Sequence, residues 1–392
     1  MNEMDKIKVL ADIVEIPSVN DDEVSVAKYI RDLFAKYGIE SKILKVKGNR
    51  ANLVAEIGEK GPILGFSGHL DVVAAKESDG WHSDPFKLVE RDGKLYGRGT
   101  SDMKSGVAAM IVSLIELQQK GLKNGRIRLM LTMGEEIGEE GSAYFYEHGY
   151  MKDVSALVIS EPTYYRIIYA EKGSLDLKIT SRGKAAHSSM PNLGYNAVNP
   201  LIELLSELNE FFSNPPKNDV LGPLTFNVTV FKGGEQVNTI PDYAEAEINV
   251  RTLPNFDGND VIKKLDEYLE KKNENGATLT REVLMNEDAV LKSPDSVIAD
   301  LAAEIVESRG REVVKTIAPG ITDASNLLKE KKEDYPFIVF GPGNPLVSHQ
   351  VDEYVEKKAY LDFIDIYQEL AEKYFIMSLD LVEYAKAYET KN

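Results

Sequence analysis

Five short polar segments of this sequence carry side chains that bind divalent metal ions, and each comes after an apolar run. The segments are Ser67-Gly68-His69-Leu70-Asp71, Gly99-Thr100-Ser101-Asp102, Gly134-Glu135-Glu136, Ser160-Glu161-Pro162 and Ser348-His349. The chain has no cysteine, so a tightly bound metal ion must be held by His, Asp and Glu. Imidazole and carboxylate ligands without thiolate suit Zn²⁺, Mn²⁺ or Co²⁺.

The number of carboxylates exceeds what one tetrahedral site needs, which favours two metal ions. Ions that share a bridging ligand lie roughly 3.5–4 Å apart in two-metal sites. If Asp102 is that bridge, His69 and Glu161 can complete one site, and Glu136 and His349 can complete the other.

Asp71 and Glu135 then remain beside the ligands and suit other roles. Asp71 follows His69 by two residues, where it can accept the second ring N–H of that imidazole and fix its tautomer. Glu135 is a free carboxylate beside the metals, as a general base acting on water requires. A lone histidine or a Glu-Glu pair is most often structural or solvated, but five such segments together indicate a metal centre.

The apolar runs predict buried β-strands at 52–57, 63–67, 127–132, 156–160 and 336–340, because they are nearly continuous rather than alternating. Helical spacing of apolar residues lies between them, at 7–15, 23–37, 103–120 and 297–308. This order predicts a doubly wound α/β domain with a mixed, mainly parallel sheet. The carboxyl ends of parallel strands converge on one crevice, so ligands far apart in sequence can meet there.

Between residues 173 and 286 the pattern changes to β-α-β-β-α-β, which is typical of an independent ferredoxin-like domain. The expected elements are strand 174–180, helix 196–212, strands 224–231 and 243–251, helix 261–272 and strand 278–283. We therefore predict a catalytic domain formed by residues 1–172 and 287–392, with residues 173–286 inserted into it.

Charge and hydropathy narrow the possible partners. The formal net charge is −18, from 64 acidic against 46 basic residues, and this charge repels nucleic acid and anionic membranes. The N-terminal region has no apolar run typical of a signal peptide, and no later run is long enough for a membrane span. We expect a cytoplasmic protein with a small-molecule partner that binds neither nucleic acid nor a membrane.

At its metal-binding motifs the sequence resembles the dizinc hydrolase family of acetylornithine deacetylase, succinyl-diaminopimelate desuccinylase, aminoacylase and related carboxypeptidases and dipeptidases. The similar segments are SGHLDVV at 67–73, GRGTSDMKSG at 97–106, GEE at 134–136, SEPT at 160–163 and the final His349, and the resemblance covers essentially the whole chain. It implies His69, Asp102, Glu136, Glu161 and His349 as ligands of two divalent ions, Asp71 as the orienting residue and Glu135 as the base.

The inserted segment is similar to the family's lid and dimerisation domain, most clearly at GKAAHSSMPNLGYNA, residues 183–197. This resemblance implies a homodimer in which His187 reaches the partner's active site and stabilises the oxyanion. Asn238 and Arg251 match lid positions that hold substrate carboxylates, a task that suits a guanidinium group. An ordinary surface role is the alternative for all three residues.

Two further segments resemble the substrate loops of the family, PGITDASNL at 319–327 and GPGNP at 341–345. Gly320, Thr322 and Asn344 are the candidates for substrate binding in them. Some desuccinylases carry an arginine in the first segment, whereas this chain has none, which leaves the acyl group open.

The resemblance is greatest to the Gram-positive branch of succinyl-diaminopimelate desuccinylases. It implies hydrolysis of the amide bond of an N-acylated amino acid, with N-succinyl-diaminopimelate, a lysine and cell-wall precursor, as the expected substrate. Acetylornithine deacetylase and a dipeptidase are the alternatives within the family. An inactive metal-binding protein is the alternative from a different class, and the presence of Glu135 argues against it.

Overall fold

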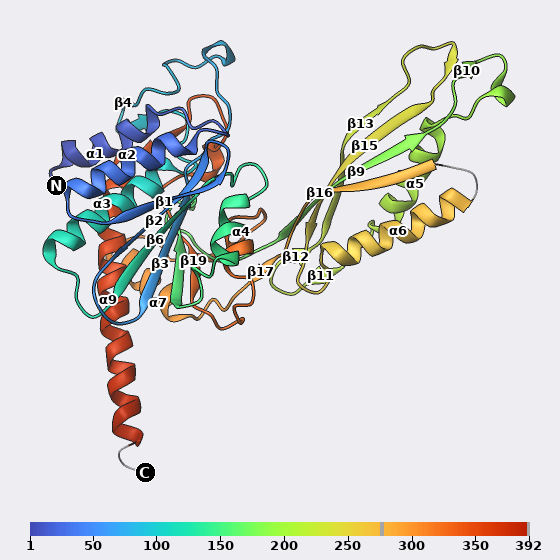
Figure 1. Cartoon of the computed structure of the whole chain (residues 1–392). Coiled ribbons are helices and arrows are strands. Elements are labelled where there is room, and N and C mark those ends of the chain that lie inside the picture. Colours follow the sequence, from blue (N-terminus) through green and yellow to red (C-terminus); the bar gives the residue numbers. More distant parts are fainter. Residues whose placement is uncertain (275–277, 390–392) are drawn as a thin grey trace. The chain divides into compact units, whose positions relative to one another are not determined.

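The structure is a computed structural model that describes residues 1–274 and 278–389. The chain divides into two compact units, which are described separately (Figure 1). The first unit comprises Met1–Tyr169, Lys292–Thr316 and Thr322–Asn392, and the second comprises Ala170–Leu291 and Ile317–Ile321. The chain thus leaves the first unit after Tyr169 and returns to it at Lys292. The borders predicted from the sequence, 172/173 and 286/287, lie three and five residues away from these.

Most strands of the first unit belong to a mixed sheet with the strand order β1-β2-β6-β3-β7-β19-β8-β17, in which β18 also pairs with β8. The strands are β1 (Ser41–Lys47), β2 (Arg50–Ile57), β3 (Ile63–His69), β6 (Arg126–Thr132), β7 (Val154–Ile159), β8 (Ile167–Glu171), β17 (Val290–Leu291), β18 (Lys315–Ala318) and β19 (Phe337–Val339). The neighbours β6, β3, β7 and β19 are parallel, whereas β1, β2, β8 and β17 form antiparallel pairs. Their nearly continuous burial explains the continuous apolar runs.

Helices cover both faces of this sheet, as expected for a doubly wound fold. The largest core lies between alternate strand residues, such as Leu64 and Phe66, and α1 (Glu3–Val14), α2 (Glu23–Lys36), α3 (Lys104–Lys120), α7 (Val297–Ser308) and α9 (Lys357–Glu389). On the other face lies α4 (Glu140–Glu147) (Figure 1), which contacts α8 (Ala324–Leu327). The α3 helix ends at Gly121, whose φ of 78° is the left-handed conformation that glycine adopts most easily.

A small antiparallel sheet in the first unit has the strand order β20-β5-β4. It consists of β4 (Val89–Arg91), β5 (Lys94–Tyr96) and β20 (Tyr354–Glu356). The short helices η1 (Glu77–Asp79) and η3 (Pro345–Val347) lie in loops of the same unit. Pairing of β5 with β20 brings the segment after residue 96 next to the segment before residue 354.

The second unit has the expected β-α-β-β-α-β order: β9 (Gly173–Arg182), α5 (Val198–Phe211), β13 (Thr225–Gly233), β15 (Tyr243–Thr252), α6 (Gly258–Glu274) and β16 (Thr278–Glu287). The antiparallel sheet order β13-β15-β9-β16 is that of a ferredoxin-like domain. Short additions are β10 (Ala186–His187) paired with β14 (Thr239–Ile240), β11 (Lys217–Asn218) paired with β12 (Gly222–Pro223), and η2 (Pro191–Leu193).

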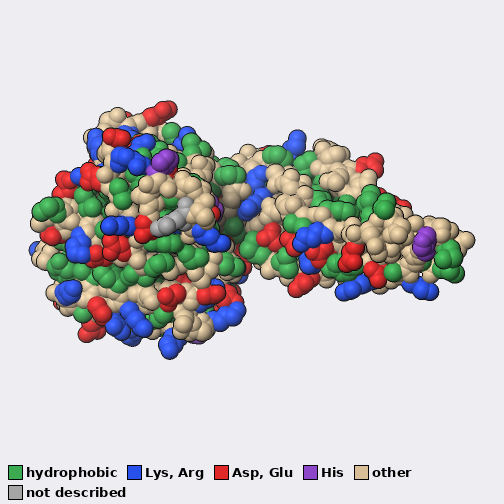
Figure 2. Space-filling model, turned by 90° about the horizontal axis from the view of Figure 1, so that it is seen from above, with side chains coloured by type: hydrophobic (Ala, Val, Ile, Leu, Met, Phe, Trp, Pro, Cys, Tyr) green, Lys and Arg blue, Asp and Glu red, His purple; other side chains and the backbone are tan. Residues whose placement is uncertain are grey.

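Acidic and basic side chains are interspersed over the face visible in Figure 2, so the negative net charge does not gather there in one patch. Among the described helices, none combines the length and the apolar character that crossing a membrane requires.

Candidate metal centre

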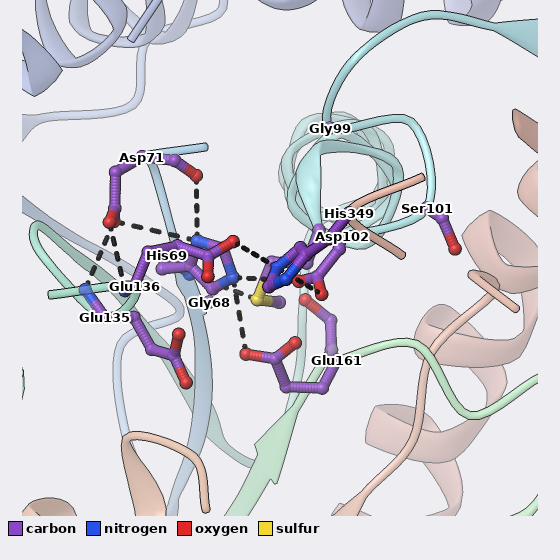
Figure 3. Close-up of polar contacts among 12 residues, drawn as sticks. Gly68, His69, Asp71, Gly99, Ser101, Asp102, Glu135, Glu136, Glu161 and His349 are labelled. Atoms are coloured by element: carbon purple, nitrogen blue, oxygen red, sulfur yellow. Dashed lines mark hydrogen bonds and ion pairs between the residues drawn. The ribbon is translucent and has the colours of Figure 1, made fainter. Parts of the chain in front are cut away.

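Three neighbouring parallel strands deliver four of the acidic and imidazole side chains to one edge of the sheet (Figure 3). His69 is the last residue of β3, Glu135 and Glu136 follow β6, and Glu161 follows β7. Because these strands are adjacent and parallel, their carboxyl ends open on the same crevice. The hydrophobic strands therefore place these side chains within reach of one another.

Asp102 and His349 reach the same place by another route. Asp102 lies between β5 and α3, and His349 lies in the loop between η3 and β20. The expectation that every candidate ligand directly follows an apolar strand of the main sheet is therefore wrong for these two. Pairing of Tyr354 with Tyr96 and of Val355 with Leu95 joins their loops instead.

The carboxylate of Asp102 lies between two groups of candidate ligand atoms. Its Oδ1 is 3.1 Å from Nε2 of His69, and that nitrogen is 3.5 Å from Oε1 of Glu161. Its Oδ2 is 3.5 Å from Nε2 of His349, and that nitrogen is 3.0 Å from Oε1 of Glu136. Each oxygen of Asp102 thus lies near one imidazole nitrogen, and each of these nitrogens lies near one further carboxylate.

These separations match the ligand spacing of a small divalent cation. Ligand atoms about 2.0–2.1 Å from a tetrahedral Zn²⁺ lie about 3.3 Å from one another. Oε1 of Glu161 is buried and has no hydrogen-bond partner among the described residues, a costly state that a cation would relieve. The residues therefore fit a metal centre, in which His69, Glu161 and one oxygen of Asp102 would hold one ion, and Glu136, His349 and the other oxygen a second.

Asp71 organises both neighbouring segments from a fully buried position. The backbone carbonyl of Asp71 accepts the Nδ1–H of His69 at 2.9 Å, which leaves Nε2 free to bind a metal. Its carboxylate is farther from Nδ1, at 3.6 Å, and instead accepts the backbone N–H groups of Gly134, Glu135 and Glu136. Asp71 therefore fixes the histidine tautomer through its main chain and the Glu135-Glu136 segment through its side chain.

Glu135 lies in the same cluster, with a carboxylate oxygen within 4.8 Å of ligand atoms of His69 and Glu161. Burial and the nearby charge of Glu161 raise the pKa of Glu135 well above its ordinary value of 4.5. Oε1 of Glu136 lies 3.0 Å from Nε2 of His349, whereas the Glu135 side chain points to a different side of the segment (Figure 3). A carboxylate that is not itself a candidate ligand, placed beside a metal centre, suits proton transfer from water.

Access to the centre differs between its two histidines. His69 is fully buried, whereas the side chain of His349 is 51% exposed. The candidate centre is therefore open to solvent, and to a substrate, on the side of His349.

Comparison with known proteins identifies the family. Residues 65–373 match the model of peptidase family M20/M25/M40. The chain belongs to this family. Its members are metal-dependent hydrolases, so the chain is a hydrolase and its acidic and imidazole cluster is the candidate metal centre.

Relatives and solved structures extend this result. A probable succinyl-diaminopimelate desuccinylase of Staphylococcus epidermidis is 40% identical, over 95% of this chain and 98% of that protein. A succinyl-diaminopimelate desuccinylase of Wolbachia pipientis is 29% identical over 95% of this chain and 94% of its own. The fold is that of an M20 family metallo-carboxypeptidase from Sulfolobus solfataricus, with a TM-score of 0.82 at 20% identity, covering 96% of this chain and all of that one.

A dinuclear metal-binding peptidase of the same family from Bacillus subtilis also shares the fold. Its TM-score is 0.70 at 20% identity, over 95% of this chain and 98% of that chain.

In this M20 family chain the glycine-rich loop at 341–345 lies against the candidate ligands. A Cβ atom on Gly341 would lie 2.2 Å from the carbonyl oxygen of Ser160, and one on Gly343 would lie 2.2 Å from that of Ser101. Only glycine permits so close an approach. Asn344 uses its side chain to accept the N–H of Leu346, so the structure gives it a local role in the loop.

The other candidates for substrate binding are distributed between the units. Thr322 is buried in the first unit, and its hydroxyl accepts the N–H of Ala324. Gly320 belongs to the second unit, with nothing within 4 Å of a Cβ placed on it. His187 is exposed in β10. The next residue, Ser188, donates its backbone N–H to the carbonyl of Asn238, so His187 and Asn238 lie close together.

Arg251 lies at the opposite end of the second unit from His187. It is near the end of β15 and pairs with Ser174 at the start of β9, about 25 Å along the strand from Tyr243. Asn238 precedes the other end of the same strand. The structure therefore groups His187 with Asn238 and separates both from Arg251.

Two buried acids beside the centre were not assigned from the sequence. Thr132 donates a 2.5 Å hydrogen bond to Oδ2 of Asp323, and Oδ1 has no hydrogen-bond partner among the described residues. Burial raises the pKa of Asp323 to about 6. The second acid, Glu353, is fully buried and contacts the segment that carries Asp102. Asp323 stands within a segment that resembles a substrate loop, but neither acid has a motif of its own.

We predict that Glu135→Gln retains both metal ions and loses nearly all turnover. The amide keeps the size of the side chain but cannot take a proton from water, and general-base catalysis contributes roughly 10²–10⁴-fold. Glu136→Gln is the matched control, since it should lose metal first. Metal content by mass spectrometry and kcat at saturating metal distinguish the two. Equal metal content and equal residual activity in both variants would contradict this division of roles.

We also predict that the affinity for divalent metal rises with pH. Burial raises the pKa of Glu161 well above 4.5. For His69, burial opposes protonation, but Glu161 and Asp102 outweigh it and hold the pKa well above 6.5. In the metal-free protein both groups therefore keep protons at pH values where their unperturbed counterparts would lose them, and a metal must displace these protons.

Chelator competition between pH 6 and pH 8 measures this effect, and calorimetry in buffers of different ionisation enthalpy counts the protons released. An affinity that stays constant over this range, with no proton release, would show that the ligands are already deprotonated in the metal-free protein.

Proposed function

We propose that this hydrolase binds two divalent cations, Zn²⁺ with Co²⁺ or Mn²⁺ as substitutes, and cleaves N-succinyl-diaminopimelate to succinate and diaminopimelate. The observation that carries the two-metal proposal is the position of Asp102, whose two oxygens lie near different imidazole nitrogens, each of which lies near a further carboxylate. The substrate is proposed from relatives at 40% and 29% identity that bear this name. We also propose that the protein is located in the cytoplasm.

The chemistry follows from the positions of the side chains. When bound, the two cations lower the pKa of a water molecule in the centre and polarise the acyl carbonyl. Glu135 takes a proton from the attacking water as the new C–O bond forms at the acyl carbon. It then gives this proton to the amide nitrogen as the C–N bond breaks, which releases the free amine and the carboxylic acid. The backbone bonds from Asp71 hold Glu135 in place for both transfers.

The second unit supports the proposal of a homodimer. His187 and Asn238 lie at one end of this unit and Arg251 lies near the other, a separation much larger than a diaminopimelate derivative. One rigid unit therefore cannot bring both ends to the same small substrate. In a homodimer, one end can serve the chain's own centre while the other end serves that of the partner, with His187 donating to the oxyanion and Arg251 holding a substrate carboxylate.

A panel of acylated amino acids tests the substrate. We expect metal-dependent release of succinate from N-succinyl-diaminopimelate with a kcat/KM at least about tenfold above that for N-acetylornithine or dipeptides, since specificity lies in contacts to the acyl and amino-acid groups. Glu135→Gln with full metal content is the control for contaminating activity. Preferential release of acetate or cleavage of dipeptides would replace the proposed substrate, and no release from any compound would contradict the activity.

Mixing of two inactive variants tests whether His187 acts across the dimer. Loss of one oxyanion donor typically lowers turnover about 10²–10³-fold, so His187→Ala should retain its metals and fold but lose kcat by that factor. Exchange of subunits with Glu135→Gln should then restore activity, because some heterodimers contain one centre with both the base and the donor. Mixtures that stay inactive despite proven subunit exchange would place the donor within its own chain or exclude His187.

A further inference from the structure

Glu353 is a fully buried carboxylate that lies next to the loop carrying Asp102. Its Oε1 accepts the backbone N–H groups of Ser101 at 2.7 Å and of Asp102 at 2.8 Å. Its Oε2 accepts the backbone N–H of Gly99 at 3.0 Å and Nη1 of Arg98 at 2.6 Å. Both oxygens thus accept two donors each, three of them from the main chain of one short loop.

The main chain of the same residue adds a further contact, because the carbonyl of Glu353 accepts the N–H of Gly97. Glu353 therefore contacts every residue from 97 to 102 except Thr100, whose N–H and hydroxyl both bond within the loop to the carbonyl of Gly97. Gly99 has a φ of +84°, a conformation that glycine adopts without steric cost, and its N–H is held by the Glu353 side chain. The shape of this loop depends on Glu353.

The donors also define the charge state that the position requires. All four partners of the Glu353 side chain donate, and none accepts. A carboxylate satisfies them, whereas a group that carries N–H or O–H would place a donor against a donor. The Arg98 guanidinium supplies the compensating positive charge at 2.6 Å.

The segment that contains Glu353 also contains His349, four residues earlier, whose Nε2 is 3.5 Å from Oδ2 of Asp102. The β20 strand that follows Glu353 pairs with the β5 strand that precedes the Asp102 loop. One short segment therefore supplies an imidazole for one side of the candidate centre and fixes the backbone of the carboxylate at its middle.

We propose that Glu353 is a positioning residue for the metal centre, which holds the Asp102 carboxylate in the orientation that presents one oxygen to each ion. Glu353 contacts neither ion in this assignment and acts through the backbone of residues 99–102. The inference rests on the proposed two-metal function. Its specific consequence is that loss of Glu353 weakens both metal sites, whereas loss of Glu136 weakens one.

Glu353→Gln is the sharpest variant, because it keeps the shape and removes both the charge and the acceptor capacity of one oxygen. We expect the affinity for Zn²⁺ to fall roughly 10–100-fold at both sites, the usual effect of losing a group that orients metal ligands. Chelator competition measures the affinity, and thermal unfolding with and without Zn²⁺ measures the stabilisation by metal. The rise in Tm on adding Zn²⁺ should shrink.

Glu116→Gln is the matched control. Glu116 is also a largely buried carboxylate, with a side chain 12% exposed, and it accepts hydrogen bonds from the N-terminal amine and Gln368. It lies on α3, about 18 Å along the helix from Lys104. We expect this variant to lower the Tm of the metal-free protein while leaving the Zn²⁺ affinity and the rise in Tm unchanged.

Wild-type Zn²⁺ affinity at both sites in Glu353→Gln, even with a lower metal-free Tm, would overturn the inference and leave Glu353 a purely structural residue. Weakening of one site alone would also overturn it. If wild-type protein does not bind two ions, the proposed function fails instead. Should Glu353→Gln not fold, Glu353→Asp keeps the charge but withdraws the carboxylate by one C–C bond, and an unchanged affinity in that variant would contradict the inference equally.

Discussion

The mutual repulsion of crowded carboxylates is the constraint on which the rest of this structure depends. Asp102, Glu135, Glu136 and Glu161 converge with His69 on one small space, and burial together with neighbouring charge raises the pKa of both Glu135 and Glu161. Such a cluster is unfavourable in a low-dielectric interior unless cations or oriented N–H groups compensate it. Backbone N–H groups of the loops provide part of this compensation, and the proposed metal ions would provide the rest.

The hydrophobic pattern was sufficient to predict the sheet and three of the strand ends that form the centre. β3, β6 and β7 are largely buried on both faces, so their sequences are mainly apolar, and the candidate ligands His69, Glu136 and Glu161 lie at or just after their carboxyl ends. The ferredoxin-like order of the second unit was equally visible, because its strands and helices have different periods. These features depend on local sequence, which is why they could be predicted.

The parts that depend on long-range pairing could not be derived from the residues alone. Asp102 and His349 meet because β5 pairs with β20, and these short strands lie more than 250 residues apart. Glu353 bonds to the Asp102 loop and Asp323 bonds to Thr132 across similarly large separations. A lone acidic residue outside a motif resembles a solvated surface residue, and only the fold reveals its burial and its partners.

The number of N–H donors around each buried acid distinguishes the roles of the acids. Asp71 accepts three backbone N–H groups, and Glu353 accepts three and an arginine. Every oxygen of these two side chains accepts at least one N–H group, so neither acid retains an oxygen without a hydrogen-bond partner. Glu161 retains a buried oxygen without a hydrogen-bond partner among the described residues, as a metal ligand must before the ion binds. The same carboxylate chemistry therefore serves either to hold a loop or to bind a metal, according to the donors that the backbone supplies.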